Sequence, residues 1–231
     1  MSKTLLRCDG VSTGYGQMAV VRDLSFHVDE GEVVALIGPN GAGKTTTLLT
    51  LAGELTPMSG TVSCLDQKAD APMHERCRNG LSYVTEERSV IMNLTAAENL
   101  KIARVSQTSA LALFPELERL LDRRAGLLSG GEQQMLTLAR ALGRHPKALL
   151  ADELSLGLAP LVVVRLLDAV QRAAKEQGVG VLLVEQHVRQ ALRIADRVLV
   201  MRRGQIVISG TAAEIKGQLH EIEAAYLSGL E

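Results

Sequence analysis

The 231-residue chain is very poor in aromatic residues. It has no Trp, three Tyr and two Phe, which together make up 2% of the sequence, whereas hydrophobic residues make up 46%. The core must therefore be built from aliphatic side chains, as it is where helices pack on a β-sheet. Modules that bind single-stranded nucleic acids stack bases on several exposed rings, so this composition argues against nucleic acid as a partner.

The sequence also lacks an excess of charge, a set of paired cysteines and a long hydrophobic run. Its formal net charge of −1 provides no basic surface for nucleic acids or anionic membranes. Cys8, Cys64 and Cys77 are not spaced as metal ligands and cannot all pair, so we interpret them as reduced thiols. We see neither a signal peptide nor a run of the roughly 20 apolar residues that span a membrane. We therefore expect a cytoplasmic protein that only partners would hold at a membrane.

Short aliphatic runs alternate with helical patterns along most of the chain. The runs at residues 33–37, 81–84, 148–151, 181–184 and 197–201 are mainly apolar, which is typical of strands buried on both faces of a parallel sheet. Between these runs, apolar residues recur at helical spacing. The alternation predicts an α/β fold with helices on both faces of the sheet.

Antiparallel pairs are predicted near both ends of the chain. Residues 5–11 and 24–28 enclose a turn-rich segment, which predicts an antiparallel flap. Residues 198–201 and 205–208 enclose Gly204 and predict a hairpin.

The middle of the chain lacks strand patterns. Helices are expected at residues 95–105 and 111–121, separated by a polar segment. We therefore predict a core of residues 1–85 and 146–231, with a helical subdomain of residues 86–145.

A glycine-rich segment carries the clearest chemical signal. Residues 38–45 read GPNGAGKT and fit the phosphate-loop pattern G-x4-G-K-[ST], directly after one predicted strand and before a helix at 46–52. Backbone N–H groups and the helix N-terminus would bind phosphate oxygens, Lys44 would bridge the β- and γ-phosphates, and Thr45 would hold Mg²⁺. The predicted nucleotide-binding residues here are Gly38, Pro39, Asn40, Gly41, Ala42, Gly43, Lys44, Thr45 and Thr46.

Two carboxylates follow the predicted strand at residues 148–151. Parallel strands end at the same edge of the sheet, so Asp152 is expected to reach Mg²⁺ and Glu153 the attacking water. Two acidic residues at a strand end are equally consistent with simple solvation. The phosphate loop favours the catalytic interpretation, because phosphoryl transfer depends mainly on positioning and charge neutralisation.

The segment LSGGEQQ, residues 128–134, is the third signal. Ser129 and Glu132 are spaced as a capping box at the start of a helix, and taken alone this is the better interpretation. Two glycines inside a helix start lower helix propensity but expose backbone N–H groups. They therefore also suit a second phosphate-binding surface.

In this order, the three segments resemble the ATP-binding subunits of ABC transporters, for which LSGGEQQ is the signature. The resemblance covers essentially the whole chain and implies a nucleotide-binding α/β core with an antiparallel flap and a helical subdomain. It also implies ATP and Mg²⁺ as cofactors. A second ATP-binding subunit, a paralogue or another copy, would pack head to tail, so that Ser129 and Gly131 close over the partner's ATP.

Further residues match family positions one by one. Tyr15 matches the aromatic residue that stacks on adenine, although it would also suit packing within the flap. His187 matches the switch histidine at the γ-phosphate, although a single histidine is also common on surfaces and in cores. Glu86 stands where most members have a glutamine that links Mg²⁺ to the membrane subunit. The implied catalytic residues are Glu153, His187 and Lys44, and the implied Mg²⁺ ligands are Thr45, Asp152 and Glu86.

Several stretches resemble the shorter ATPase subunit of branched-chain amino-acid importers. These are SLGLAPLVV at 155–163, VLLVEQHVRQAL at 181–192 and AAYLSG at 224–229. Relatives that carry urea, amides or other small organic solutes look similar. The resemblance implies ATP hydrolysis coupled to transport, two integral membrane permease subunits, an extracytoplasmic solute-binding protein, and a place on the inner face of the cell membrane.

Other functional classes are less consistent with the sequence. A soluble ABC ATPase of translation, DNA repair or cluster assembly is an alternative. Translation factors of this kind, however, carry two cassettes in one chain, whereas this sequence contains a single cassette. A GTPase or small-molecule kinase is disfavoured because N-K-x-D is absent. A non-hydrolytic regulatory module is a further alternative, because Leu154 replaces the usual proline after the carboxylates and Glu86 replaces the usual glutamine.

Overall fold

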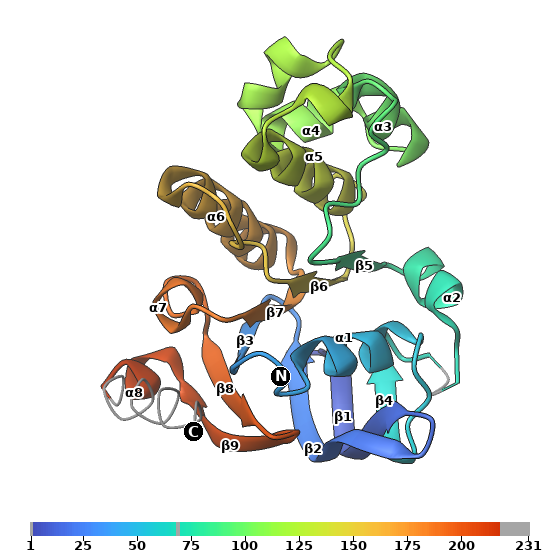
Figure 1. Ribbon diagram of the computed structural model, residues 1–231, viewed down its shortest axis with the longest axis vertical. Coiled ribbons are helices and arrows are strands. Elements are labelled where there is room, and N and C mark those ends of the chain that lie inside the picture. The colour runs from blue at the N-terminus through green and yellow to red at the C-terminus, as the bar shows by residue number, and fades with distance from the viewer. Residues whose placement is uncertain (1, 68–69, 218–231) are drawn as a thin grey trace.

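The computed structural model describes residues 2–67 and 70–217, in which nine strands form two sheets (Figure 1). The strands are β1 (Thr4–Tyr15), β2 (Met18–Asp29), β3 (Val33–Ile37), β4 (Ser59–Cys64), β5 (Leu81–Val84), β6 (Ala148–Asp152), β7 (Gly180–Glu185), β8 (Arg197–Arg202) and β9 (Gln205–Thr211). One sheet is antiparallel, in the order β2-β1-β4. The other has the order β5-β6-β7-β3-β8-β9 and is parallel except at β8–β9. The segment 224–229 lies outside the described residues.

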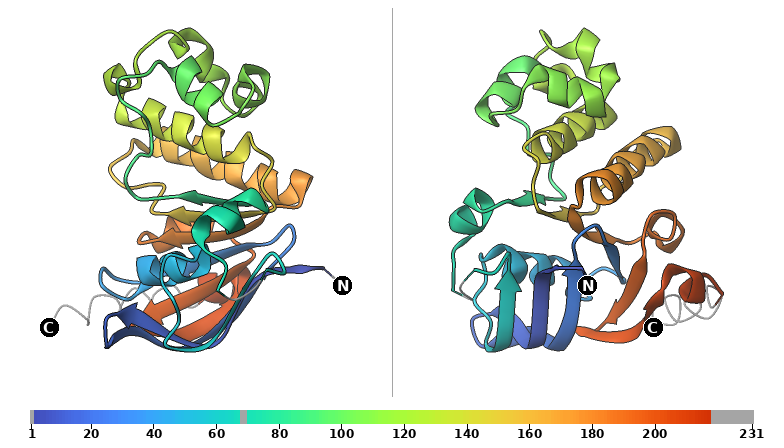
Figure 2. Two further views of the ribbon diagram at one scale, coloured as in Figure 1. Left: turned by 90° about the vertical axis from the view of Figure 1, so that its right-hand side faces the viewer. Right: turned by 180° about the vertical axis from the view of Figure 1, so that it is seen from behind.

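Helices cover the larger sheet and fill the space between the sheets. They are α1 (Lys44–Ala52), α2 (Met73–Arg78), α3 (Ala96–Ile102), α4 (Gln107–Leu113), α5 (Gly130–Leu142), α6 (Pro160–Gln177), α7 (Val188–Ala191) and α8 (Ala212–Gly217), with 3-10 turns η1 (Pro115–Leu120) and η2 (Ala125–Leu127). The segments α3 to α5 gather at one end of the molecule, beyond β5 and β6 (Figures 1 and 2). None of the helices in the described part of the chain has both the length and the apolar character that a membrane-spanning helix needs.

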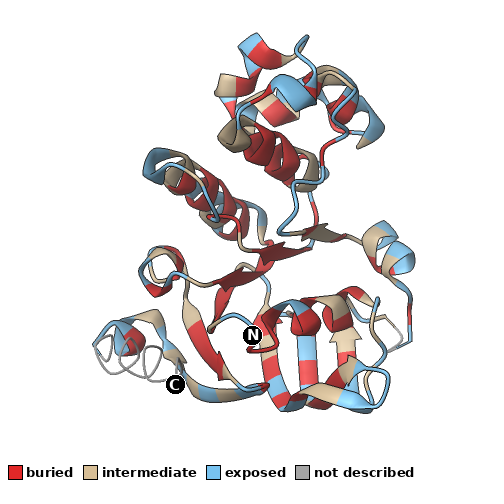
Figure 3. Cartoon of the chain, in the orientation of Figure 1, coloured by how far each residue is buried: buried red, intermediate tan, exposed pale blue. Residues whose placement is uncertain are grey.

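The central strands are buried along their whole lengths (Figure 3). In β3, Val34 and Leu36 share one buried cluster with Leu48 and Leu51 of α1, whereas Ile37 belongs to a second cluster near α7 and α8. Successive side chains of a strand point to opposite faces, so β3 is covered on both faces. This burial confirms the α/β fold that the aliphatic runs predict.

The antiparallel flap is confirmed, but it is larger than predicted. Strands β1 and β2 continue to a tight turn at Gly16 and Gln17, and β4 adds a third strand. The sequence of β4 shows little apolar alternation, since three of its six residues are exposed. Its pairing with β1 brings Gly60 so close that a Cβ atom there would lie 2.3 Å from the carbonyl oxygen of Gly10.

The helix predicted at residues 111–121 is wrong. α4 ends at Leu113, and Pro115 begins the 3-10 turn η1 instead. Proline has no N–H for the helix and disfavours helical backbone in the preceding residue, and Phe114 has φ −137° and ψ 85°. The helix predicted at 95–105 is shorter, because Thr95 caps α3 and Arg104 adopts φ +58°. The division of the chain at residues 86 and 146 stays a prediction.

Candidate functional site

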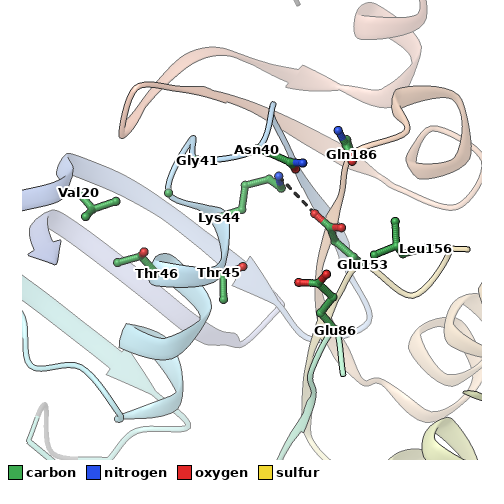
Figure 4. Close-up of a pocket in the computed structure, with 11 residues that line it drawn as sticks. Val20, Asn40, Gly41, Lys44, Thr45, Thr46, Glu86, Glu153, Leu156 and Gln186 are labelled. Carbon is green, nitrogen blue, oxygen red and sulfur yellow. Dashed lines mark ion pairs between the residues drawn. The ribbon is translucent and has the colours of Figure 1, made fainter. Parts of the chain in front are cut away.

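A cavity of about 310 Å³ lies where the phosphate loop faces the carboxyl ends of the parallel strands (Figure 4). The loop follows β3, Glu86 follows β5, Glu153 follows β6 and Gln186 follows β7. Carboxyl ends of parallel strands meet at one edge of a sheet, which is where α/β proteins bind ligands. The lining residues are Val20, Asn40, Gly41, Gly43, Lys44, Thr45, Thr46, Glu86, Glu153, Leu156 and Gln186.

The phosphate loop turns sharply into α1 at Gly43. Its φ of +108° is a backbone conformation that L side chains rarely adopt. A Cβ atom at this position would also lie 3.0 Å from Cγ2 of Val21 and 3.1 Å from Cε of Met201. Because α1 starts at Lys44, the N–H groups of its first turn and the positive end of its dipole lie at the cavity.

The Lys44 side chain is buried, but its ammonium group reaches polar atoms. Nζ donates hydrogen bonds to the carbonyl oxygens of Gly38 (2.9 Å) and Pro39 (3.2 Å). It also lies 3.5 Å from Oε1 of Glu153, whose side chain is 12% exposed. The cavity therefore holds a fixed positive charge beside a carboxylate, on the loop expected to bind phosphates.

The residues around Asp152 fit a magnesium ion. Asp152 is 1% exposed, and within the described structure its buried Oδ1 has no hydrogen-bond partner. Burial raises the pKa of Asp152 to about 6, against the lowering effect of a hydrogen bond from Thr45, while nearby Glu153 and Glu86 raise it further. An unpartnered carboxylate oxygen beside a hydroxyl and further carboxylates is the oxygen-rich environment that Mg²⁺ prefers. No cluster of three or more His, Cys, Asp or Glu side chains arranged as a metal site occurs in the described residues, and Mg²⁺ commonly completes its shell with water and phosphate oxygens.

Comparison with known proteins agrees with this site. The family model described as ABC transporter matches residues 21–155. The chain belongs to the ABC transporter ATPase family. It is thus an ATP-binding subunit and an ATPase.

Individual relatives of this ABC ATPase extend over nearly its full length. The high-affinity branched-chain amino acid transport ATP-binding protein BraG of Pseudomonas aeruginosa is 40% identical over 97% of this chain and 100% of BraG. The lipopolysaccharide export system ATP-binding protein LptB of Acidithiobacillus ferridurans is 35% identical over 91% of this chain and 92% of LptB. The crystal structure of the ADP conformation of MJ1267, an ATP-binding cassette of an ABC transporter, superposes with a TM-score of 0.86 at 26% identity, over 98% of this chain and 99% of MJ1267.

Several predicted nucleotide contacts of the ABC ATPase do not line the cavity. They include Gly38, Pro39 and Ala42 of the phosphate loop, as well as Tyr15 and His187. Tyr15 lies at the end of β1 and is 55% exposed. His187 is exposed at the N-terminus of α7, whereas its neighbour Gln186 lines the cavity. Sequence reasoning missed Gln186, although its position directly after β7 corresponds to that of Glu153 directly after β6.

The signature of the ABC ATPase lies at the start of α5, away from the phosphate loop of the same chain. The capping box is confirmed: Ser129 Oγ accepts a hydrogen bond from Glu132 N (3.3 Å), and Glu132 Oε2 accepts one from Ser129 N (2.8 Å). Neither Ser129 nor Gly131 lines the first cavity. Helix α5 instead contributes Gln133 and Gln134 to a second cavity of about 390 Å³, which shares Glu86, Glu153 and Leu156 with the first.

Proposed function

We propose that this ABC ATPase powers a transporter of branched-chain or other hydrophobic amino acids. The observation that carries the proposal is the 40% identity to BraG over the full length of that protein. The proposal includes import as the direction, which the sequence resemblance favours. Export is the competing possibility, because the chain is also 35% identical to a lipopolysaccharide export ATPase.

Binding of ATP would begin at the phosphate loop. The N–H groups of residues 38–45 and the first turn of α1 would bind phosphate oxygens, and Lys44 would exchange its carbonyl partners for the β- and γ-phosphates. Tyr15 is exposed at the edge of the flap and would stack on the adenine ring. Thr45, Asp152 and Glu86 would hold Mg²⁺, which neutralises charge on the phosphates when it is bound.

Hydrolysis would depend on Glu153. Its carboxylate is partly buried beside Lys44 and would orient a water molecule and accept its proton as the water oxygen attacks the γ-phosphorus. The bond between the γ-phosphorus and the bridging oxygen breaks, and ADP leaves. We assign Gln186, rather than His187, as the polar residue after β7 that contacts the γ-phosphate, because Gln186 lines the cavity.

The signature would act in a dimer. In one chain, Ser129 and Gly131 lie away from the phosphate loop, so the start of α5 would close over the ATP of a second subunit, another copy or a paralogue. Two permease subunits would hold the pair at the inner face of the membrane, and an extracytoplasmic binding protein would supply the solute. Closure and release of the dimer would then drive the permeases between their two states.

Replacement of Glu153 tests the enzymatic half of the proposal. Glu153→Gln should reduce ATP turnover to background but leave ATP-dependent dimerisation, measured by phosphate release and by size-exclusion chromatography with ATP. Glu176→Gln, on the exposed face of α6, is the control and should behave as the wild type. Substantial turnover by Glu153→Gln would contradict the role of Glu153.

The solute requires the whole transporter. We would isolate the complex that contains this subunit and titrate its binding protein by calorimetry with leucine, valine, urea and small amides. Saturable binding of leucine or valine supports the proposal, whereas binding of urea or amides alone contradicts it. A complex that extracts lipopolysaccharide, or a subunit that purifies without any membrane protein, would also contradict it.

A further inference from the structure

A buried carboxylate joins the ends of two strands at the edge of the cavity. Glu185, the last residue of β7, is 1% exposed. Its Oε2 accepts a hydrogen bond from the hydroxyl of Ser155 (2.8 Å), and its Oε1 accepts one from the N–H of Ser155 (3.2 Å). Glu185 itself does not line the cavity, so the proposed hydrolytic chemistry leaves this carboxylate without a role.

These bonds hold the loop that leaves β6. Glu153 has a left-handed backbone, with φ +47°, and its N–H donates to the carbonyl oxygen of Val184 (3.0 Å). The loop then turns tightly, since Leu156 N–H donates to the carbonyl oxygen of Glu153 (3.3 Å). The loop of residues 153–158 is therefore attached to β7 at two successive points, the second of which is Glu185.

Three cavity residues depend on this attachment. Glu153 and Leu156 lie on either side of Ser155, and Gln186 directly follows Glu185. Figure 4 shows these three residues together, across the cavity from the phosphate loop. A shift of Ser155 away from Glu185 would move Glu153 and Leu156 relative to Lys44.

The same loop also faces outward. Leu156 is 45% exposed, and Leu161, in the first turn of α6, is 82% exposed. Both side chains therefore leave apolar surface accessible next to the cavity. The resemblance to ABC ATP-binding subunits implies that residues 155–158 form the loop that crosses to the partner subunit, so in the proposed dimer this exposed side of the loop would face the partner.

We propose that Glu185 is a positioning residue that couples the hydrolytic position of Glu153 to the partner-facing loop through Ser155. The inference rests on the proposed function. Loss of the hydrogen bonds should leave ATP binding by the single subunit intact, because the phosphate loop is not involved. It should slow hydrolysis and weaken ATP-driven dimerisation together.

The test uses Glu185→Gln, Ser155→Ala and the double variant. Because removing one partner leaves a buried polar group without its hydrogen bond, we expect kcat to fall by about 10- to 100-fold in each single variant. The Kd for a fluorescent ATP analogue should stay within about twofold. Introduced into Glu153→Gln protein, either change should raise the ATP concentration needed for dimerisation. Ser82→Ala, which removes a hydroxyl that donates to the carbonyl oxygen of Ala141, is the matched control and should change none of these values.

The double variant distinguishes coupling from two independent effects. If Glu185 acts through Ser155, the double variant should be no slower than the slower single variant. Additive losses, an unchanged kcat in folded Glu185→Gln protein, or parallel losses of kcat and ATP affinity would overturn the inference. Urea unfolding shows which variants fold. If Glu185→Gln protein does not fold, Ser155→Ala still tests the inference. Glu153→Gln protein that never dimerises with ATP, either with itself or with a paralogous subunit from its complex, would overturn the proposed dimer and this inference with it. Failure confined to the variants at Glu185 and Ser155 affects the inference alone.

Discussion

The ammonium nitrogen of Lys44 lies 3.5 Å from Oε1 of Glu153, and both side chains are largely buried. The pair joins the first residue of α1 to the first residue after β6. Lys44 therefore lies between the loop carbonyls and the carboxylate proposed to act on water.

Lys44→Ala should weaken ATP binding, because the change removes a buried positive charge from the phosphate site. We expect the Kd of a fluorescent ATP analogue to rise by about tenfold or more, as for loss of a hydrogen bond to a charged group. Lys101→Ala, an exposed position in α3, is the control. Unchanged ATP affinity in folded Lys44→Ala protein would contradict the assignment of Lys44.

Gln186 and His187 form a natural pair for comparison. Gln186→Ala should lower kcat by about tenfold or more, since removing one polar group aimed at developing charge has effects of this size. His187→Ala should keep kcat within about twofold, because the side chain is exposed outside the cavity. Steady-state phosphate release measures kcat for both variants. A larger loss of kcat in His187→Ala than in Gln186→Ala would restore His187 as the γ-phosphate contact.

Ser129 and Thr95 cap two helices in the same way. Thr95 Oγ1 accepts from Glu98 N (3.1 Å), and Glu98 Oε2 accepts from Thr95 N (2.8 Å), as in the capping box of Ser129. Each change to Ala should lower the free energy of unfolding by about 1 kcal/mol, measured with urea.

Only the change at Ser129 should affect the dimer. Ser129→Ala should weaken ATP-dependent dimerisation of Glu153→Gln protein, whereas Thr95→Ala should not. Equal effects of the two variants on dimerisation would mean that Ser129 is simply a helix cap.

Glu185 should make stability depend on pH. Burial raises the pKa of Glu185 to about 7 in the folded protein, above the value of about 4.3 in an unfolded chain. Between these values the folded state binds more protons, so the contribution of Glu185 to the free energy of unfolding falls as pH rises. Between about pH 5 and pH 8 the stability of Glu185→Gln relative to the wild type should increase by about 2–3 kcal/mol. Urea unfolding across this range measures the difference, and a constant difference would contradict the prediction.

Arg76 of α2 stabilises the C-terminal end of α1, the helix that follows the phosphate loop. It is 2% exposed, and its guanidinium donates to the carbonyl oxygens of Leu51 (2.6 Å) and Ala71 (2.8 Å). Arg76→Met would leave these buried acceptors without their donor and should lower the free energy of unfolding by about 2–4 kcal/mol. Arg78 is exposed and lies in α2, the helix that also contains Arg76. Arg78→Met should therefore change the free energy of unfolding by less than about 0.5 kcal/mol.

Local features were predictable because one short segment contains all their parts. The phosphate loop needs consecutive N–H groups, a conformationally free Gly43 and a following helix, which residues 38–52 encode together. The capping box of Ser129 and Glu132 needs only a spacing of three residues. Aliphatic runs likewise identified the buried strands, since burial on both faces leaves no room for polar side chains.

Other features depend on contacts between distant segments. Strand β4 has a sequence with little apolar pattern and exists through its pairing with β1. Pro115 is visible in the sequence and indicates a helix break. The helical spacing of apolar residues on both sides of it nevertheless led to the prediction of one continuous helix. The bonds between Ser155 and Glu185 join positions thirty residues apart.

The sequence by itself determined that this protein binds nucleotide phosphates and belongs among the ABC ATPases, because that chemistry resides in contiguous motifs. Only the tertiary structure decided which side chain after β7 enters the cavity. The register of β7 beside β6 places Gln186 there and leaves His187 exposed. Such a choice depends on strand register and on where a strand ends, and neither follows from the local order of residues.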